Sequence, residues 1–332
     1  MCRLQPRSFA VARLAVITLV ASALAAPVAR ADIVSVSAMM RGVPIIAEQC
    51  SALPQAVWIS THGKSFCIRY YLSTAGGDGK RPVVMLQGDQ LGRFDARFGQ
   101  FHPAPDQKVT DTDTDNLVKF ADRISKTAGG PAIYLARIGV DGSSGHHGIR
   151  HSLLELYAMN AALDTLKLRH RFEGYSLIGQ SGGATLVGGL LALRTDIACA
   201  VPGSGRLALL STSRNPDPLA APFDPSAMIP AIARNRAARI LVVTDPQDMT
   251  VPVQHQSTFV ASLRRAGGNV EQFMVEAIDP KHHGVVAYAT YTAGACLSGK
   301  SNAEIAQGLA ALVAKRVAAA KAASENKAQE AF

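Results

Sequence analysis

Short apolar runs alternate with longer helical patterns from about residue 65 onward. The apolar, β-branched runs predict strands at 65–73, 82–87, 132–137, 174–179, 197–201, 239–244 and 270–276. The patterns between them predict helices at 116–127, 150–169, 183–194, 253–266 and 302–323. Several strand runs, such as PVVMLQ and RILVVT, are continuously hydrophobic, which is typical of strands buried on both faces. The alternation therefore predicts an α/β domain whose mostly parallel central sheet is flanked by helices.

Two segments depart from this alternation. Residues 207–236 contain five prolines and interrupt the pattern after the predicted strand at 197–201, so we expect a short cap over the site there. The last helical pattern is rich in alanine, lysine and glutamate, and we expect it to pack through Ile305, Leu309 and Leu312. Residues 302–332 are thus predicted to form a C-terminal helix followed by a tail.

The first 31 residues have the organisation of a secretory signal peptide. Three arginines precede an apolar run at 14–26, and Ala29-Arg30-Ala31 provides small residues for cleavage. The apolar run of 13 residues is shorter than the ~20 residues that a membrane-spanning helix needs. We therefore expect residues 1–31 to be removed, leaving one domain at 32–332 that is exported to the periplasm or secreted without stable membrane insertion.

The charge distribution argues against a nucleic-acid partner. The chain carries a formal net charge of +9, and the predicted signal peptide accounts for four arginines and no acidic residue, so the mature chain would carry +5. Its remaining lysines and arginines are scattered, with no dense basic patch and no interleaved aromatic residues. The composition, 48% hydrophobic, is sufficient for a large buried core.

The cysteine count is consistent with an oxidising compartment. Cys2 would leave with the signal peptide, so four cysteines remain: Cys50, Cys67, Cys199 and Cys296. An even count in an exported protein favours disulfides, and four cysteines allow three pairings. Proximity in the sequence favours Cys50–Cys67 and Cys199–Cys296.

The motif Gly179-Gln180-Ser181-Gly182-Gly183 is the strongest chemical signal in the chain. It follows the apolar strand pattern YSLIG and precedes the helical pattern ATLVGGLLALR, so it matches G-x-S-x-G in a strand, turn and helix context. Glycines on both sides of the serine allow the strand and the helix to approach closely. Ser181 is therefore predicted to be a nucleophile exposed at the end of a strand.

A serine nucleophile needs a base and an acid that orients the base. Aspartates 245 and 248 follow the predicted strand at 239–244, and histidines 282 and 283 follow the one at 270–276. In a parallel sheet these loops lie at the same edge as the serine turn. The residues alone leave the choice within each pair open.

The order of these motifs resembles that of the α/β-hydrolase superfamily, in its serine esterase and prolyl oligopeptidase-like branches. Residues 248–252 match the Asp-x-x-Val-Pro pattern of the family's acid loop, so the resemblance implies Asp248 as the acid, with Asp245 as the alternative. It also implies His283 as the base, because the family's histidine usually precedes a small residue and a helix. His282 is the alternative.

The resemblance also suggests an oxyanion hole and a substrate-binding loop. The N–H of Gly182 is expected to be one oxyanion donor. The turn Gln87-Gly88-Asp89-Gln90 resembles the family's His-Gly loop with glutamine in place of histidine, so Asp89 or Gln90 is expected to supply the second N–H. The loop at 138–148 resembles a family loop beside the pocket, which makes His146 and His147, together with Gln180, candidates for substrate binding.

Two further patterns could indicate metal binding but have simpler explanations. The acidic residues Asp111, Asp113, Asp115 and Asp122 partly match a calcium loop, but the turn glycine and the bidentate glutamate are missing. Thr114 or Asp115 is expected instead to be the N-cap of the helix that begins at Asn116, with the acidic residues favoured by the helix dipole. The two His-His pairs lack the spacing that puts two zinc ligands on one helical face. We therefore expect no metal and no cofactor.

These features together predict a serine hydrolase that cleaves a small-molecule ester through a Ser-His-Asp triad and an acyl-enzyme. A serine peptidase of the prolyl oligopeptidase type, acting on a short peptide, is the alternative within the same chemistry, although the chain has no room for a propeller domain. An acyltransferase would use the same residues. A non-catalytic binding protein on the same fold is the alternative from another class.

Overall fold

The computed structural model describes residues 33–34, 41–90, 93–95, 100–102, 112–209 and 217–330. Residues 32–332 form one compact unit. The predicted signal peptide at 1–31, Asp111 and part of the predicted cap lie outside the described residues. No helix among the described residues is long and apolar enough to cross a membrane.

The centre of the fold is an eight-stranded sheet with the strand order β12-β11-β10-β9-β4-β8-β3-β2. The strands from β12 to β8 are parallel, and β3 and β2 add an antiparallel edge. Their bounds are β2 (Ala56–Thr61), β3 (Lys64–Ser73), β4 (Val83–Leu86), β8 (Ala132–Leu135), β9 (Tyr175–Gln180), β10 (Ile197–Gly203), β11 (Arg239–Thr244) and β12 (Val270–Met274). Four short strands form two separate pairs: β1 (Ile33–Val34) with β7 (Thr112–Asp113), and β5 (Arg93–Asp95) with β6 (Gln100–His102).

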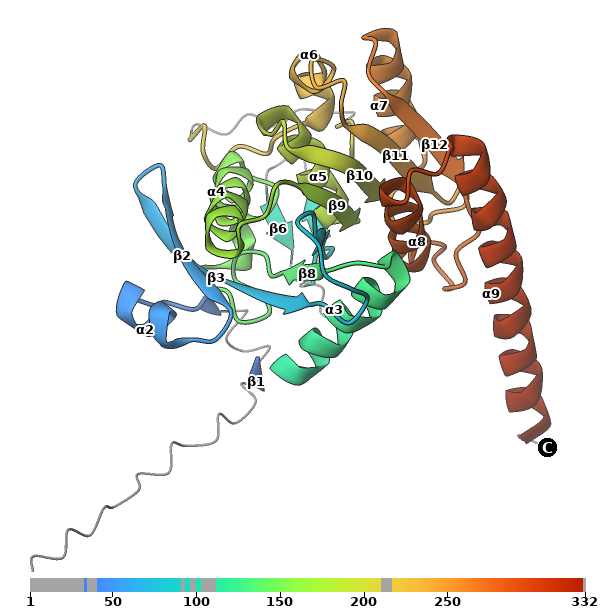
Figure 1. Cartoon of the computed structure of the whole chain (residues 1–332), viewed down its shortest axis with the longest axis horizontal. Helices are drawn as coiled ribbons and strands as arrows, with labels where there is room; N and C mark the ends of the chain where they lie inside the picture. Colours follow the sequence, from blue (N-terminus) through green and yellow to red (C-terminus); the bar gives the residue numbers. More distant parts are fainter. Residues whose placement is uncertain are drawn as a thin grey trace, which may run out of the picture. The chain divides into compact units, whose positions relative to one another are not determined.

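Helices cover both faces of the sheet (Figure 1). One face packs against α4 (Leu153–His170), α5 (Gly182–Leu193), α6 (Ile229–Ile232) and α7 (Gln254–Arg265), and the other against α3 (Thr114–Ala128), α8 (Val286–Leu297) and α9 (Asn302–Glu330). Successive strand residues alternate between the two cores: Val84 and Leu86 of β4 contact the first, and Val83 and Met85 contact the second. Burial on both faces explains why the strands read as continuous apolar runs. The predicted α/β class is confirmed.

The predicted strands and helices agree with the structure to within a few residues at most ends, but several elements were not predicted, among them α6, the four short paired strands and, longer than these, three others. The three longer elements are α2 (Ala47–Ala52), β2 and α8. Helix α8 is buried along most of its length, from Tyr288 to Cys296, so its sequence VAYATYTAGACL lacks the polar face that marks a surface helix. The C-terminal helix packs as predicted, with Ile305 and Leu309 buried and Leu312 against the same core.

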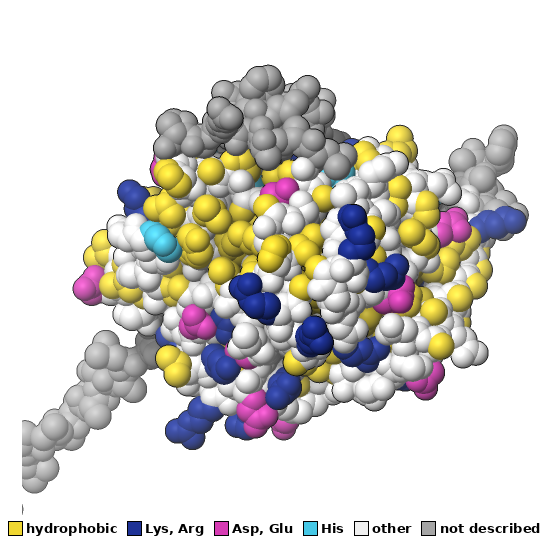
Figure 2. All heavy atoms as spheres, turned by 90° about the horizontal axis from the view of Figure 1, so that it is seen from above, with side chains coloured by type: hydrophobic (Ala, Val, Ile, Leu, Met, Phe, Trp, Pro, Cys, Tyr) yellow, Lys and Arg dark blue, Asp and Glu magenta, His cyan; other side chains and the backbone are white. Residues whose placement is uncertain are grey.

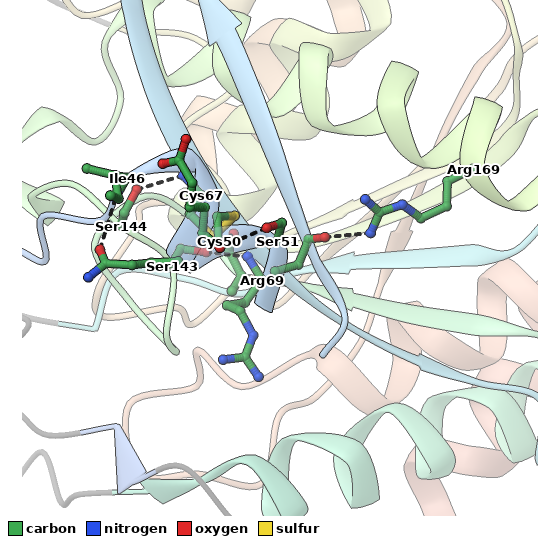
Figure 3. Close-up of a disulfide and its surroundings, with 12 residues drawn as sticks. Ile46, Cys50, Ser51, Cys67, Arg69, Ser143, Ser144 and Arg169 are labelled. Atoms are coloured by element: carbon green, nitrogen blue, oxygen red, sulfur yellow. Dashed lines mark hydrogen bonds between the residues drawn. A yellow bond between two sulfur atoms is a disulfide. The ribbon is translucent and has the colours of Figure 1, made fainter. Parts of the chain in front are cut away.

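Both predicted disulfide pairings are confirmed. Cys50–Cys67 joins α2 to β3, and Cys199–Cys296 joins β10 to α8. Around the first disulfide, the loop after β8 is attached to β3 by two serines (Figure 3): Ser144 Oγ accepts from the N–H of Cys67 at 2.7 Å, and Ser143 Oγ accepts from the N–H of Arg69 at 3.0 Å. The loop that follows β8 is therefore fixed to the sheet edge.

The predicted cap is described at residues 207–209 and 217–236, and the second of these segments lies against the start of α4. The N–H of Phe223 donates to the carbonyl of His151 at 3.0 Å, and the N–H of Leu153 donates to the carbonyl of Ala221 at 3.1 Å. A short 3-10 helix, η2 (Pro225–Met228), leads into α6, and Phe223 and Ile229 are buried in the core. This segment therefore covers α4 and α5 on one face of the sheet.

Acidic side chains are interspersed among the lysines and arginines on the face that Figure 2 shows. This agrees with the scattered charges in the sequence.

Candidate active site

The candidate residues follow the carboxyl ends of neighbouring parallel strands. Gln87–Gln90 follow β4, Ser181 follows β9, the two aspartates follow β11, and the two histidines follow β12. In a parallel sheet these ends lie on one edge, where the sites of open α/β sheets form.

Ser181 sits in a strained turn between β9 and α5. Its backbone has φ 53° and ψ −117°, a conformation that residues with a side chain rarely adopt. Its N–H donates to the carbonyl of Gly203 at 2.9 Å, and its own carbonyl accepts from the N–H of Ala184 as α5 begins. Such strain persists only where the surrounding structure enforces it, and here it presents the half-buried serine at the end of the strand.

Close backbone contacts explain the two outer glycines of the motif. A Cβ on Gly179 would lie 2.4 Å from the carbonyl oxygen of Gly183, and a Cβ on Gly183 would lie 2.0 Å from the carbonyl oxygen of Leu86. Both distances are far shorter than van der Waals contact, so the end of β9 can pack against the start of α5, and the start of α5 against the end of β4, only without these side chains.

Asp248 and His283 form a hydrogen-bonded pair. The Nδ1 of His283 lies 2.8 Å from Oδ2 and 3.0 Å from Oδ1 of Asp248. The Asp248 carboxylate, whose side chain is fully buried, also accepts from the N–H groups of Thr250 and Val251 at 2.8 and 2.9 Å. These bonds hold the carboxylate rigidly, so it can orient the imidazole and stabilise its protonated form.

Asp245 and His282 form a second pair beside the first. The Nδ1 of His282 lies 3.0 Å from Oδ2 of Asp245, which also accepts from the N–H of Ala277 at 2.7 Å. Asp245 lines a groove of about 660 Å³ whose other wall is α9. Asp245 therefore faces the side of the sheet that α9 covers.

Gln180 links the serine turn to the histidine loop. Its Nε2 donates to the carbonyl of His283 at 2.7 Å, and its Oε1 accepts from the N–H of Val285 at 3.2 Å. The side chain is buried, and both ends of its carboxamide bind backbone. Gln180 was predicted as a substrate-binding candidate, and the structure gives it these contacts with the protein itself.

The histidine loop has a second anchor in Asp279. Its carboxylate accepts from the N–H groups of Lys281, His283 and Gly284 at 3.1, 3.1 and 2.7 Å. Although burial raises the pKa of Asp279, the hydrogen bonds from the N–H groups of Gly284 and His283 outweigh it and hold the pKa below its ordinary value. The loop conformation therefore depends on an ionised carboxylate.

No hydrogen bond joins Ser181 Oγ to the ring of His283 within the described ranges. Catalytic hydrogen bonds are often long in the absence of substrate and shorten when it binds. The backbone of His283 is joined to the serine turn through Gln180, the residue directly before Ser181.

The predicted oxyanion loop packs directly on the serine. A Cβ on Gly88 would lie 3.0 Å from Ser181 Cβ. The Asp89 side chain points to a buried charged cluster, with Oδ1 2.9 Å from Nη1 of Arg137 and Oδ2 2.8 Å from Nε2 of His151. Burial raises the pKa of Asp89, but the adjacent His151, Arg137 and Arg150 outweigh it and hold the pKa well below the ordinary value.

Gln90 anchors the same loop on its other side. Its Nε2 donates to Oδ2 of Asp141 at 2.7 Å, and the hydroxyl of Tyr134 donates to the same oxygen. Asp141 is buried, and this desolvation raises its pKa despite the two hydrogen bonds. Successive residues Asp89 and Gln90 thus bind different polar groups contributed by β8 and the loop that follows it.

The two histidines predicted at the substrate site occupy different environments. His146 is exposed, and its Nδ1 accepts from the N–H of Gly148 at 2.8 Å. His147 is buried, with Nδ1 3.0 Å from the carbonyl oxygen of Ile138. Burial and the nearby Arg137 and Arg150 lower the pKa of His147 well below its ordinary value, so this imidazole is neutral near pH 7.

No cluster of His, Cys, Asp or Glu among the described residues could hold a metal ion. The N-cap of α3 is Asp113, which accepts from the N–H of Asn116 at 2.8 Å, so the expected cap at Thr114 or Asp115 is wrong: the helix begins at Thr114, two residues earlier than predicted. Asp122 accepts from the hydroxyl of Ser73.

Sequence reasoning missed Arg137 and Glu155, which form the centre of the charged cluster. Arg137 Nε lies 2.9 Å from Oε1 of Glu155, and both side chains are almost fully buried. The available signal was an arginine at the end of a continuous apolar strand, AIYLAR, where a charge needs a partner. Its partners lie 18 and 48 residues away, so the sequence could not identify them.

Comparisons with known structures agree with this architecture. An esterase of Pyrococcus furiosus, Pf2001, is similar with a TM-score of 0.52 at 14% sequence identity, over 77% of this chain and 96% of that chain. The Thermus thermophilus protein TT1662 gives a TM-score of 0.50 at 14% identity, over 74% and 96%. No protein-family model and no curated protein sequence matches this chain. The sheet topology and these similarities show an α/β-hydrolase fold.

Proposed function

We propose that this protein is a serine hydrolase that cleaves a small-molecule ester through an acyl-enzyme. The observation that carries the proposal is the linkage at the sheet edge: Gln180 joins the strained turn of Ser181 to the backbone of His283, whose imidazole is bound to Asp248. The similar structure from Pyrococcus furiosus is described as an esterase, which agrees with this chemistry.

In the proposed reaction, Ser181 Oγ attacks the ester carbonyl carbon while His283 Nε2 takes its proton. The negative charge on the carbonyl oxygen is stabilised by the N–H of Gly182 and by an N–H of Asp89 or Gln90. His283 then gives the proton to the departing alcohol as the C–O bond breaks. A water molecule, deprotonated by His283, hydrolyses the acyl-enzyme and releases the acid. Asp248 stabilises the imidazolium in both steps.

Two features favour Asp248 and His283 over the neighbouring pair. Gln180 binds the backbone of His283 and of Val285, so the His283 segment is attached to the serine turn. Asp245 instead lines the groove against α9. We assign Asp245 and His282 the role of supporting the loop.

Hydrolysis of p-nitrophenyl acetate and butyrate tests the proposal. We expect Ser181→Ala and His283→Ala to lower kcat by at least ~10³-fold. His282→Ala should retain much more activity than His283→Ala, and Asp245→Asn more than Asp248→Asn. A chain that folds but hydrolyses no ester, or one in which Ser181→Ala remains active, would contradict the proposal.

A peptidase of the prolyl oligopeptidase type is the second candidate, because it would use the same residues. Dipeptidyl p-nitroanilides distinguish the two, since an esterase should show a much lower kcat/KM for these amides than for the esters.

We also propose that the chain is exported and that residues 1–31 are removed. The two disulfides support this, because such bonds persist in oxidising compartments. Mass spectrometry of the protein recovered from the periplasm or medium should find a chain that begins at Asp32, and a chain retaining residues 1–31 would contradict the proposal.

A further inference from the structure

The oxyanion loop is attached to a buried arginine that no part of the proposed reaction uses. Nη1 of Arg137 donates to Oδ1 of Asp89 at 2.9 Å and to the carbonyl oxygen of Gln87 at 3.3 Å. One nitrogen therefore binds the loop through both a side chain and the backbone.

The arginine itself is held rigidly. Its Nε and Nη2 bind the two carboxylate oxygens of Glu155 at 2.9 and 3.0 Å. Glu155 Oε2 also accepts from the N–H of His151 at 2.7 Å. The side chains of Arg137 and Glu155 are 1% and 0% exposed. Because the guanidinium is planar and two of its nitrogens bind Glu155, the direction in which Nη1 points is fixed.

The ion pair of Arg137 and Asp89 lies against the residue that follows the nucleophile. A Cβ on Gly182 would lie 2.2 Å from Asp89 Oδ1 and 2.9 Å from Arg137 Nη1. On the other side of the loop, Gly88 packs on the side chain of Ser181. The pair therefore contacts both sources of the proposed oxyanion donors, the loop after β4 and the start of α5.

The negative charge of Asp89 must be balanced at this position. An unpaired carboxylate beside the oxyanion hole would repel the negative charge that develops there. Asp89 is neutralised by Arg137 and by Arg150, whose Nε lies 3.6 Å away, and its Oδ2 accepts a hydrogen bond from Nε2 of His151 at 2.8 Å.

We propose that Arg137 is a positioning residue for the oxyanion hole: through its ion pair with Asp89 it fixes the backbone of residues 87–90 beside Ser181. This inference rests on the proposed function. It assigns Arg137 no contact with the substrate, so its loss should weaken transition-state stabilisation and leave ground-state binding nearly unchanged.

The test compares two variants of the pair, Asp89→Asn and Arg137→Lys, with a matched control. Asp89→Asn keeps the shape of the side chain and removes its negative charge. Arg137→Lys keeps the positive charge and removes the planar guanidinium that binds Asp89 and Glu155 at the same time. The control is Asp196→Asn, because Asp196 is likewise bound by a buried arginine, Arg194, at 2.8 and 2.9 Å, away from the candidate site.

We expect both variants of the pair to lower kcat for p-nitrophenyl butyrate by about 10- to 100-fold with KM within about twofold. The affinity for a trifluoromethyl ketone, whose adduct carries an oxyanion, should fall by a similar factor. Asp196→Asn should lower the melting temperature but leave kcat and ketone affinity within twofold. If Arg137→Lys does not fold, Asp89→Asn decides.

Folded variants that keep kcat, or that lose kcat without losing ketone affinity, would overturn the inference. An equal loss of kcat in Asp196→Asn would also overturn it, because the effect would then be general loosening of the fold. A wild-type chain that hydrolyses no ester would overturn the proposed function, and this inference with it.

Discussion

The Gln180 side chain offers a sharp test of how the site is assembled. Gln180→Met keeps the length and approximate volume of the side chain and removes both of its hydrogen bonds, to the carbonyl of His283 and the N–H of Val285. Each backbone group would then lack its partner, at about 1–3 kcal/mol per group. We therefore expect the free energy of unfolding to fall by about 2–6 kcal/mol, which corresponds to roughly 3–10 °C in melting temperature for a unit of this size.

The catalytic effect should be larger than the effect on substrate binding. Without the two hydrogen bonds of the Gln180 carboxamide, His283 is no longer fixed relative to Ser181. We therefore expect kcat to fall by about 10- to 100-fold, since small misplacements of reacting groups have effects of this size. KM should stay within about twofold, because the carboxamide binds backbone at both ends. Stopped-flow hydrolysis of p-nitrophenyl butyrate measures kcat and KM, and thermal melting measures the change in stability.

Asn235→Ala is a suitable control, because Asn235 Nδ2 also donates to a backbone carbonyl, that of Arg194, at 3.0 Å. It should lower stability by about 1 kcal/mol and leave kcat unchanged. A rise in KM with unchanged kcat in Gln180→Met would refute the reasoning and indicate that Gln180 binds substrate instead.

Three further predictions concern the fold around the site. Gly183→Ala would bring Cβ to 2.0 Å from the carbonyl oxygen of Leu86, so we expect the free energy of unfolding measured in urea to fall by about 3 kcal/mol or more. Gly130 has open space around it, so Gly130→Ala should be tolerated, and equal effects of the two substitutions would contradict the close-packing argument. Burial raises the pKa of Asp141, so the folded state binds this proton more tightly than the unfolded state does. The carboxyl is protonated in both states below about 3.8, and from there its ionisation lowers the stability of the wild type until the pH exceeds the folded-state pKa. In urea unfolding the stability of Asp141→Asn relative to wild type should therefore increase as pH rises from 3.8, and a flat or falling difference would refute this prediction. Replacing Cys199 and Cys296 by alanine should lower the free energy of unfolding by about 2–5 kcal/mol in urea unfolding, because their bond closes a loop of 97 residues; unchanged stability would contradict this role.

The sequence predicted most of the fold because its buried strands are continuous and its turns contain glycine or proline. The strand at Arg239–Thr244 was predicted with both of its ends, and both disulfide pairings were predicted from spacing. Helix α8 was missed because it is buried without a polar face. The antiparallel edge formed by β2 was missed because the periodic pattern was traced only from about residue 65.

The candidate site likewise has features that the sequence predicts and features that it does not. The strained turn at Ser181 follows from local glycine spacing, which a sequence displays directly. The sequence does not reveal the charged cluster around Arg137, because its members come from the loop after β4, the loop after β8 and the first turn of α4. Long-range pairs of this kind depend on the tertiary fold. The same holds for Gln180, whose partners lie 103 and 105 residues away.

The most direct test of the central claim is covalent labelling of the folded protein with a fluorophosphonate, followed by mass spectrometry of its peptides. The account predicts one adduct, on the peptide that contains Ser181, formed in wild type and absent in Ser181→Ala. No labelling of the folded wild type, or an adduct that persists in Ser181→Ala, would contradict the claim that Ser181 is an activated nucleophile.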